Sequence, residues 1–232
     1  MPRVVHVLRA GRLGYQSSLN LQQIASNSVL NRSDGPVRNI LILTEHDPVY
    51  TVGIRTKAYG AEEEQRLRAL GAEFYRTNRG GLITFHGPGQ LVAYPVLNLR
   101  NFQPSVRWYV CQIESTIIDL CSKMGIRANR THDTGIWVQD RKICAIGIHA
   151  SRYVTTHGLA LNCNTDLRWF EHIVPCGIEG KGVTSLSGEL KREVDVEDVI
   201  PQFLGSFRET LECDLVEMDE AERGEVLKRI GQ

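Results

Sequence analysis

The chain has 232 residues, of which 42% are hydrophobic, and this is enough for one globular domain with a sizeable core. Lysine plus arginine and aspartate plus glutamate both number 27, and the resulting zero net charge argues against a general nucleic-acid binder. No stretch approaches the run of about 20 apolar residues that spans a bilayer, so we predict a soluble protein without a membrane partner.

The N-terminal part of the sequence is poor in acids. Arg3, Arg9 and Arg12 precede the first acidic residue, Asp34, and several serines follow the arginines. Such N-termini are typical of organellar import signals, so we predict a mitochondrial protein. The plainer interpretation, that residues 4–8 form the first strand, is compatible with import. A bacterial chain would instead be cytoplasmic.

In chain order, helical spacing of apolar residues predicts helices over residues 15–30, 61–70, 105–124, 198–211 and 220–230. Ser105 and Gly125 suit the start and end of the third helix, and Pro201 is expected in the first turn of the fourth. Strands are predicted over residues 4–8, 39–44, 136–138, 142–149 and 155–161, with a loop over 31–36 and a turn plus extended segment over 45–53. We therefore predict one α+β domain over residues 1–232, with a mixed, mostly antiparallel sheet and packed helices.

The six cysteines are spread singly along the chain, and the nearest two are ten positions apart. Without a CxxC pair we expect neither a zinc ribbon nor a redox pair, and we predict no metal and no cofactor. The size of the chain, its full complement of core residues and the lack of a recognisable signal peptide favour reduced thiols over disulfides. One of them, Cys176, lies between Pro175 and three glycines within residues 173–182. Turns display reactive groups, so Cys176 is a candidate nucleophile. The alternative is a buried turn cysteine that behaves as a small hydrophobic residue.

Residues 79–90 hold four glycines around a short apolar strand. The segment lacks the GxxxxGK[ST] spacing of a phosphate loop, but its backbone can approach a ligand closely. Two tight turns flanking a strand would give the same pattern. Arg79 and His86 favour the ligand site, because each is an unusual choice for a plain hairpin turn.

A cysteine nucleophile needs a proton acceptor. The sequence offers His86, His149 and His157, and also Lys142, which begins an apolar strand. Sequence spacing does not decide between them, and a solvated lysine at the start of a strand is the plainer interpretation of Lys142.

Four ordered motifs carry a resemblance to a known family. They are the segments 79–81 with 86–90, 142–147, 157–162 and 175–177. Together they resemble the lipoyl(octanoyl) transferases, which move octanoate from acyl carrier protein to lipoyl domains. The resemblance implies the fold of the biotin/lipoate protein ligase catalytic domain and, given the N-terminus, a mitochondrial member.

The resemblance also implies roles for individual residues. Cys176 becomes the nucleophile that carries the acyl group as a thioester, and Lys142 the general acid/base. Backbone N–H groups around Gly80 and Gly177 become candidate oxyanion donors. The acyl pocket is expected to comprise Arg79, Gly80, Gly81, Leu82, Ile83, Thr84, Phe85, His86, Ala145, Ile146, Gly147, Gly158, Leu159 and Ala160.

The implied partners are octanoyl-acyl carrier protein as donor and lipoyl domains as acceptors. Those acceptors are the lipoyl domains of 2-oxoacid dehydrogenase E2 subunits and the glycine cleavage H protein, and we expect a monomeric enzyme in lipoate biosynthesis. Two alternatives stay open. An ATP-dependent lipoate or biotin protein ligase would use the same fold without a nucleophilic cysteine, and an inert carrier-protein-binding module would leave the donor thioester intact.

Overall fold

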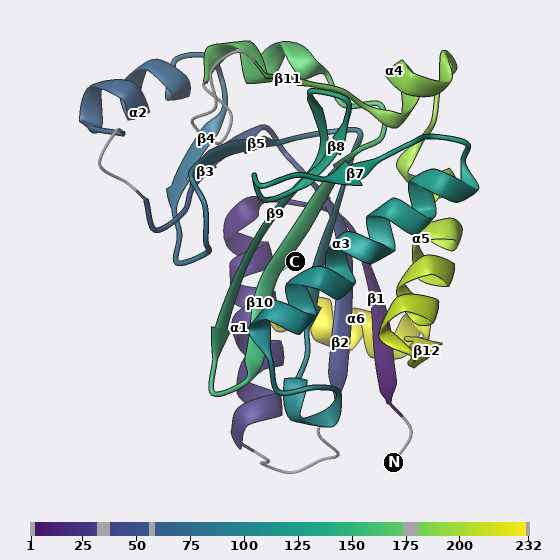
Figure 1. Cartoon of the computed structure of the whole chain (residues 1–232). Coiled ribbons are helices and arrows are strands. Elements are labelled where there is room, and N and C mark those ends of the chain that lie inside the picture. Colours follow the sequence, from purple (N-terminus) through teal and green to yellow (C-terminus); the bar gives the residue numbers. More distant parts are fainter. Residues whose placement is uncertain (1–2, 32–37, 56–58, 174–180, 231–232) are drawn as a thin grey trace.

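The computed structural model describes residues 3–31, 38–55, 59–173 and 181–230 (Figure 1). Its largest feature is a mixed sheet in the order β12-β1-β2-β6-β10-β9-β8-β7, with β11 paired to β9. The strands are β1 (Val4–Leu13), β2 (Asn39–His46), β6 (Gln90–Val96), β7 (Asn129–Arg130), β8 (Ile136–Val138), β9 (Arg141–Ser151), β10 (Val154–Asn162), β11 (Gly182–Val183) and β12 (Asp214–Glu217).

Strand β1 runs parallel to both of its neighbours, and β11 runs parallel to β9. All pairs from β2 through β6, β10, β9 and β8 to β7 are antiparallel. The predicted mixed, mostly antiparallel sheet with packed helices is therefore confirmed, including the meander formed by β8, β9 and β10.

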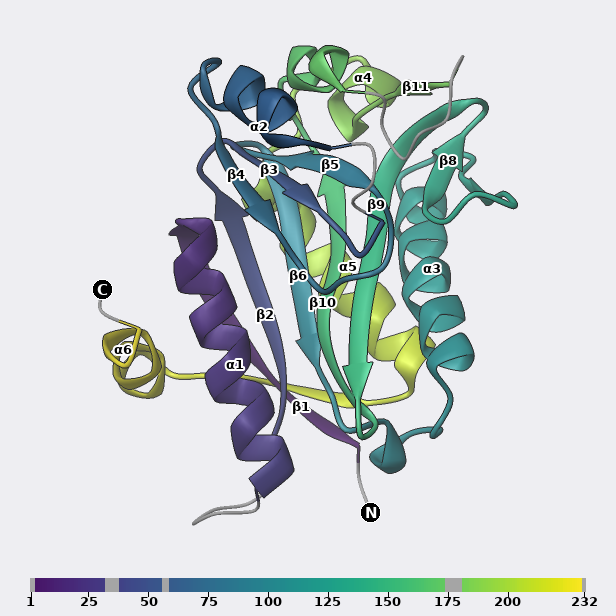
Figure 2. The same ribbon diagram turned by 90° about the vertical axis from the view of Figure 1, so that its left-hand side faces the viewer.

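Both faces of the sheet are apolar, because side chains alternate between the faces along each strand. On β2, Leu41 and Leu43 join the cluster under α3 (Val106–Lys123) and α5 (Val196–Leu211). Ile40 and Ile42 join the opposite cluster, which α1 (Tyr15–Asn31) covers. Figure 2 shows α1 in front of the sheet and the other two helices behind it.

Helix α3 begins and ends where the sequence predicts its caps. Ser105 precedes α3, and its hydroxyl accepts a hydrogen bond from the Trp108 N–H at 3.2 Å. Gly125 follows this helix with a φ of +79°, which a glycine adopts without steric cost. No helix in the described ranges is long and apolar enough to cross a membrane.

A small second sheet lies beside one end of the large one (Figure 1). Its order is β4 (Glu73–Arg76), β3 (Val49–Val52) and β5 (Ile83–His86), and α2 (Ala61–Arg68) and the 3₁₀ helix η2 (Leu167–His172) belong to the same apolar cluster. The cluster is aromatic: the Phe85 and Trp169 rings stack with centroids 5.0 Å apart. The remaining described elements are η1 (Leu99–Asn101), α4 (Leu186–Leu190) and α6 (Glu220–Lys228).

One detail of the helix prediction is wrong. Pro201 does not lie in the first turn of its helix, because α5 begins at Val196 and the proline is in the second turn. Val196, Val199, Ile200 and Phe203 are all buried, and this apolar stripe extends the helix to the earlier start. From residue 32 onward, the loop predicted over 31–36 lies outside the described residues.

Candidate active site

A cavity of about 310 Å³ lies where the start of α1, strand β5 and the strands β6, β9 and β10 meet. Cavities of about 300–1,000 Å³ are typical of small-molecule sites. Three separate segments of the predicted pocket come together in its wall. They contribute Arg79, Gly81, Leu82, Thr84, His86, Ala145, Ile146, Gly147, Gly158, Leu159 and Ala160.

Strand alternation divides the segment that was predicted as one continuous pocket wall. On β5, Thr84 and His86 line the cavity, whereas Ile83 and Phe85 belong to the apolar cluster beneath the small sheet. Gly80 is also not among the lining residues. Its N–H donates to the Ile148 carbonyl at 2.9 Å, so it joins the loop to β9 and is already engaged as a hydrogen-bond donor.

Arg79 holds this loop in place. Its guanidinium is buried and donates to the carbonyls of Thr51 at 2.6 Å, Gly80 at 2.9 Å and Leu82 at 3.0 Å. Gly147 on β9 faces the loop so closely that a Cβ there would lie 2.8 Å from the Gly80 oxygen. The loop and β9 therefore form one rigid wall of the cavity.

Burial keeps three histidines in or beside the cavity wall in the neutral form, namely His46, His86 and His157. Burial lowers the pKa of His86 well below its ordinary value, and the nearby His46 and Arg79 lower it further. Its two ring nitrogens contact Gln90 Oε1 at 2.8 Å and Thr51 Oγ1 at 3.2 Å. Burial likewise lowers the pKa of His46 to about 4 and that of His157 to about 3. These contacts favour structural roles for the histidines over a role as the base.

The Lys142 side chain, at the start of β9, is held by several contacts. The residue is buried, and its Nζ donates to the Thr134 carbonyl at 3.0 Å and lies 4.7 Å from the centre of the Trp137 ring. Gly135, with a φ of +117°, packs on the side chain so closely that a Cβ there would lie 3.1 Å from Lys142 Cε. The lysine head group is therefore held by the turn that precedes β8.

The predicted nucleophile, Cys176, lies outside the described residues, as does the whole turn over 174–180. The chain is described again from Lys181, and β11 then pairs with β9 so that Val183 lies opposite Lys142. The Thr184 N–H donates to the Lys142 carbonyl at 3.0 Å.

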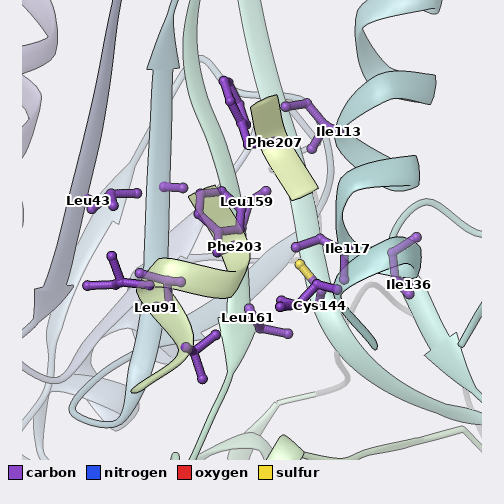
Figure 3. Packing of buried hydrophobic residues seen from close by; sticks show 14 of the residues in the cluster. Leu43, Leu91, Ile113, Ile117, Ile136, Cys144, Leu159, Leu161, Phe203 and Phe207 are labelled. Atoms are coloured by element: carbon purple, nitrogen blue, oxygen red, sulfur yellow. The ribbon is translucent and has the colours of Figure 1, made fainter. Parts of the chain in front are cut away.

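Cys144, a second thiol near Lys142 in sequence, is a packing residue. Figure 3 shows its sulfur in the core between α3 and the sheet, close to Ile117 and Leu161. Burial raises the pKa of this thiol well above its ordinary value. The residue is therefore suited to the core and not to nucleophilic attack.

Several cavity residues were not predicted as part of the acyl pocket, although His157 was considered as a base. They come from elements far apart in the sequence, and only their position in the fold brings them together. Tyr15 starts a helix and Tyr94 lies on a buried strand, so the sequence around each of them indicates a core residue. The full set comprises Tyr15, Arg55, Val92, Tyr94, His132, Asp133, Thr134 and His157.

Comparison with known proteins places this chain in a family. The lipoyl protein ligase A/B catalytic domain family matches residues 15–208. The mitochondrial octanoyl-[acyl-carrier-protein]:protein N-octanoyltransferase of Danio rerio is 59% identical over 91% of this chain and 94% of that protein. The enzyme of the same name from Homo sapiens is 48% identical over 93% of this chain and 96% of that protein.

A solved structure of lipoate-protein ligase A with bound ATP is similar in fold, with a TM-score of 0.70 at 16% identity, over 99% of this chain and 94% of that one. The chain belongs to the lipoyl protein ligase A/B catalytic domain family. Within that family it is a mitochondrial acyltransferase, as predicted. The predicted octanoyl transfer in lipoate biosynthesis is confirmed, and the ATP-dependent ligase and the inert binding module are not favoured.

Proposed function

We propose that the chain transfers an octanoyl group from octanoyl-acyl carrier protein to a lysine of lipoyl domains, through a thioester on Cys176. The proposed acceptors are the lipoyl domains of 2-oxoacid dehydrogenase E2 subunits and the glycine cleavage H protein, and the proposed enzyme is a monomer. The observation that carries the proposal is the β9–β11 pair. It brings the chain that follows Cys176 back onto Lys142, beside a cavity of suitable size.

The first half of the proposed reaction forms the acyl-enzyme. Lys142 takes the proton of Cys176, the resulting thiolate attacks the carbonyl of the donor thioester, and the bond to the carrier sulfur breaks. The carrier thiolate leaves as a thiol after it receives this proton from Lys142. An ordinary thiol with a pKa near 8.5 is only about 3% thiolate at pH 7, so a basic partner is needed. Lys142 is the proposed partner, because its head group is fixed at one end of the cavity wall.

The second half forms the amide. The amine of the acceptor lysine attacks the Cys176 thioester, the carbon–sulfur bond breaks, and the amine proton passes to Lys142. The acyl chain occupies the cavity during both steps. The small side chains of Ala145 and Ala160 line the cavity and leave room for the acyl chain. The oxyanion donor must be a group other than the Gly80 N–H, because that N–H already donates a hydrogen bond to the Ile148 carbonyl.

The first test is intact mass after incubation with octanoyl-acyl carrier protein and no ATP. The wild-type protein should gain one octanoyl group, and Cys176→Ala should gain none. Cys111→Ala is the matched control, because Cys111 is exposed and lies on the outer helix α3. An adduct on Cys176→Ala would place the nucleophile elsewhere, and a strict need for ATP would favour the ligase chemistry.

The second test addresses the base. Lys142→Met keeps much of the buried stem and removes the ammonium group, so the fold should persist. We expect octanoyl transfer to slow by about 10²–10⁴-fold, the usual contribution of a positioned proton-transfer group. Thermal unfolding of the variant checks its stability. A near-normal rate in a folded Lys142→Met protein would assign the base to another residue.

A further inference from the structure

The turn before β8 carries an acidic group at the edge of the cavity. Asp133 lines the cavity together with His132 and Thr134, and its side chain is only 16% exposed. Its carboxylate lies 3.3 Å from Lys181 Nζ and 3.2 Å from His132 Nε2. His132 is almost fully exposed, so the principal charged partner of Asp133 is Lys181.

Two lysine head groups share one aromatic ring at this point. Lys142 Nζ lies 4.7 Å and Lys181 Nζ 4.8 Å from the centre of the buried Trp137 ring. The ring is fixed, because its Nε1–H donates to the Asp133 carbonyl at 3.1 Å. Aromatic faces attract ammonium groups, and the nearby Asp133 carboxylate attracts the Lys181 head group.

The two lysines are held unequally. Lys142 is buried on a sheet strand and donates to the Thr134 carbonyl. The Lys181 side chain is 27% exposed, and within the described part of the chain it contacts the Asp133 carboxylate and the Trp137 ring. Lys181 is the less buried of the two lysines, and an incoming ammonium group that takes over the Asp133 carboxylate and the Trp137 ring would replace the contacts that Lys181 gives up.

We propose that Asp133 and the Trp137 ring form a recognition site for the ammonium group of the acceptor lysine, and that Lys181 occupies this site until the acceptor arrives. The proposal rests on the proposed function above. Lys181 presents the same chemical group as the acceptor, an ammonium on a four-carbon stem. The site lies next to Lys142, the proposed base, and its carboxylate residue, Asp133, lines the acyl cavity.

The charges explain why such a site is needed. An acceptor lysine arrives as a cation, and Lys142 opposes its approach whenever Lys142 itself is charged. The Asp133 carboxylate offsets this repulsion and orients the incoming stem toward the ring. Lys181 competes for the same carboxylate, so it should weaken acceptor binding, whereas Asp133 should strengthen it. The two residues are therefore expected to have opposite effects.

The test compares Asp133→Asn and Lys181→Met, with Lys123→Met as the control for loss of a lysine from an exposed ion pair on α3. The affinity of the unacylated enzyme for a lipoyl domain is measured directly, so the result does not depend on Cys176. The same titration is repeated with a lipoyl domain whose target lysine is replaced by glutamine. Cysteine acylation is followed separately by intact mass.

We expect Asp133→Asn to raise the Kd for the lipoyl domain about tenfold and Lys181→Met to lower it by about threefold or more. Lys123→Met should leave it unchanged. The glutamine-substituted domain should bind wild type and Asp133→Asn equally. Equal affinity of Asp133→Asn and wild type for the normal domain, or a weaker Lys181→Met complex, would overturn the proposal. Failure of the proposed function would appear instead as absent cysteine acylation in the wild-type protein.

Discussion

Lys142 shows what local sequence reveals about a single residue and what it does not. Its place at the head of an apolar strand, and the family motif, made it a candidate base. Its contacts with Thr134 and Trp137 were not predictable, because they depend on an irregular register between β8 and β9. Ile136 pairs with Cys144, but Trp137 pairs with Lys142, and this shift turns the indole toward the lysine.

A buried neutral histidine makes stability depend on pH. His46 bonds to the Leu13 carbonyl at 2.8 Å and the Tyr94 hydroxyl at 2.7 Å, and burial lowers its pKa to about 4. The unfolded chain, with an ordinary histidine pKa near 6.5, binds an extra proton between these values. The stabilisation is therefore complete above pH 6.5 and is lost as the pH falls toward 4.

We expect the free energy of unfolding to fall by up to about 1.4 kcal/mol per pH unit for each such histidine in this window. His46→Gln can keep both hydrogen bonds without titrating. Its free energy of unfolding should therefore depend less steeply on pH than that of the wild type, by the contribution of one proton. Urea unfolding at several values between pH 7.5 and 5 measures both slopes. Identical slopes for the variant and the wild type would contradict the assignment.

At the scale of elements, the sequence predicted most of the regular structure but treated the pocket segment as one block. The alternation of β5 could have separated Thr84 and His86 from Ile83 and Phe85, because the two apolar residues share one face. Strand β12 was not predicted, because its residues are largely exposed and show no apolar strand pattern. Its pairing with β1 stabilises the extended conformation. The turn that carries Cys176 stays a prediction.

Gly158 lies where β10 packs closely against β6, and it also lines the cavity. A Cβ at this position would lie 2.1 Å from the Ala93 carbonyl oxygen, on a paired strand that cannot move away. We expect Gly158→Ala to lower the free energy of unfolding by about 1–3 kcal/mol and to impair octanoyl transfer.

The control for Gly158→Ala is Gly205→Ala. Gly205 lies inside α5, and a Cβ there would meet nothing within 4 Å. This substitution should stabilise the protein by about 0.5–1 kcal/mol, because alanine is the better helix former. Urea unfolding compares the two variants. A Gly158→Ala protein as stable as wild type would show that β6 can yield at this point.

At the scale of the whole molecule, the cavity and the C-terminal helix are independent parts. The family match ends at residue 208, whereas α6 begins at Glu220 and covers Leu8, Ile40 and Ile42 on the α1 face. No residue beyond 160 is among the described residues that line the cavity.

Removal of residues 219–232 should therefore lower the free energy of unfolding by about 1–2 kcal/mol, because part of this apolar face becomes exposed. Cysteine acylation should keep its wild-type rate. Glu222→Ala, which removes only the 2.9 Å contact with Arg38, should cost less than about 1 kcal/mol. Thermal unfolding measures the stability, and intact mass measures cysteine acylation. Loss of acylation in a folded truncated protein would show that α6 supports the site.

The distribution of thiols makes the protein suitable for selective chemical labelling. Cys121, Cys144, Cys163 and Cys213 are buried, and burial raises the pKa of each, so they should resist alkylation in the native state. Cys111 is exposed. In a Cys111→Ser protein, any single-site reaction with iodoacetamide can be assigned to Cys176. An octanoyl donor that blocks this labelling would then report acyl transfer without a mass spectrometer.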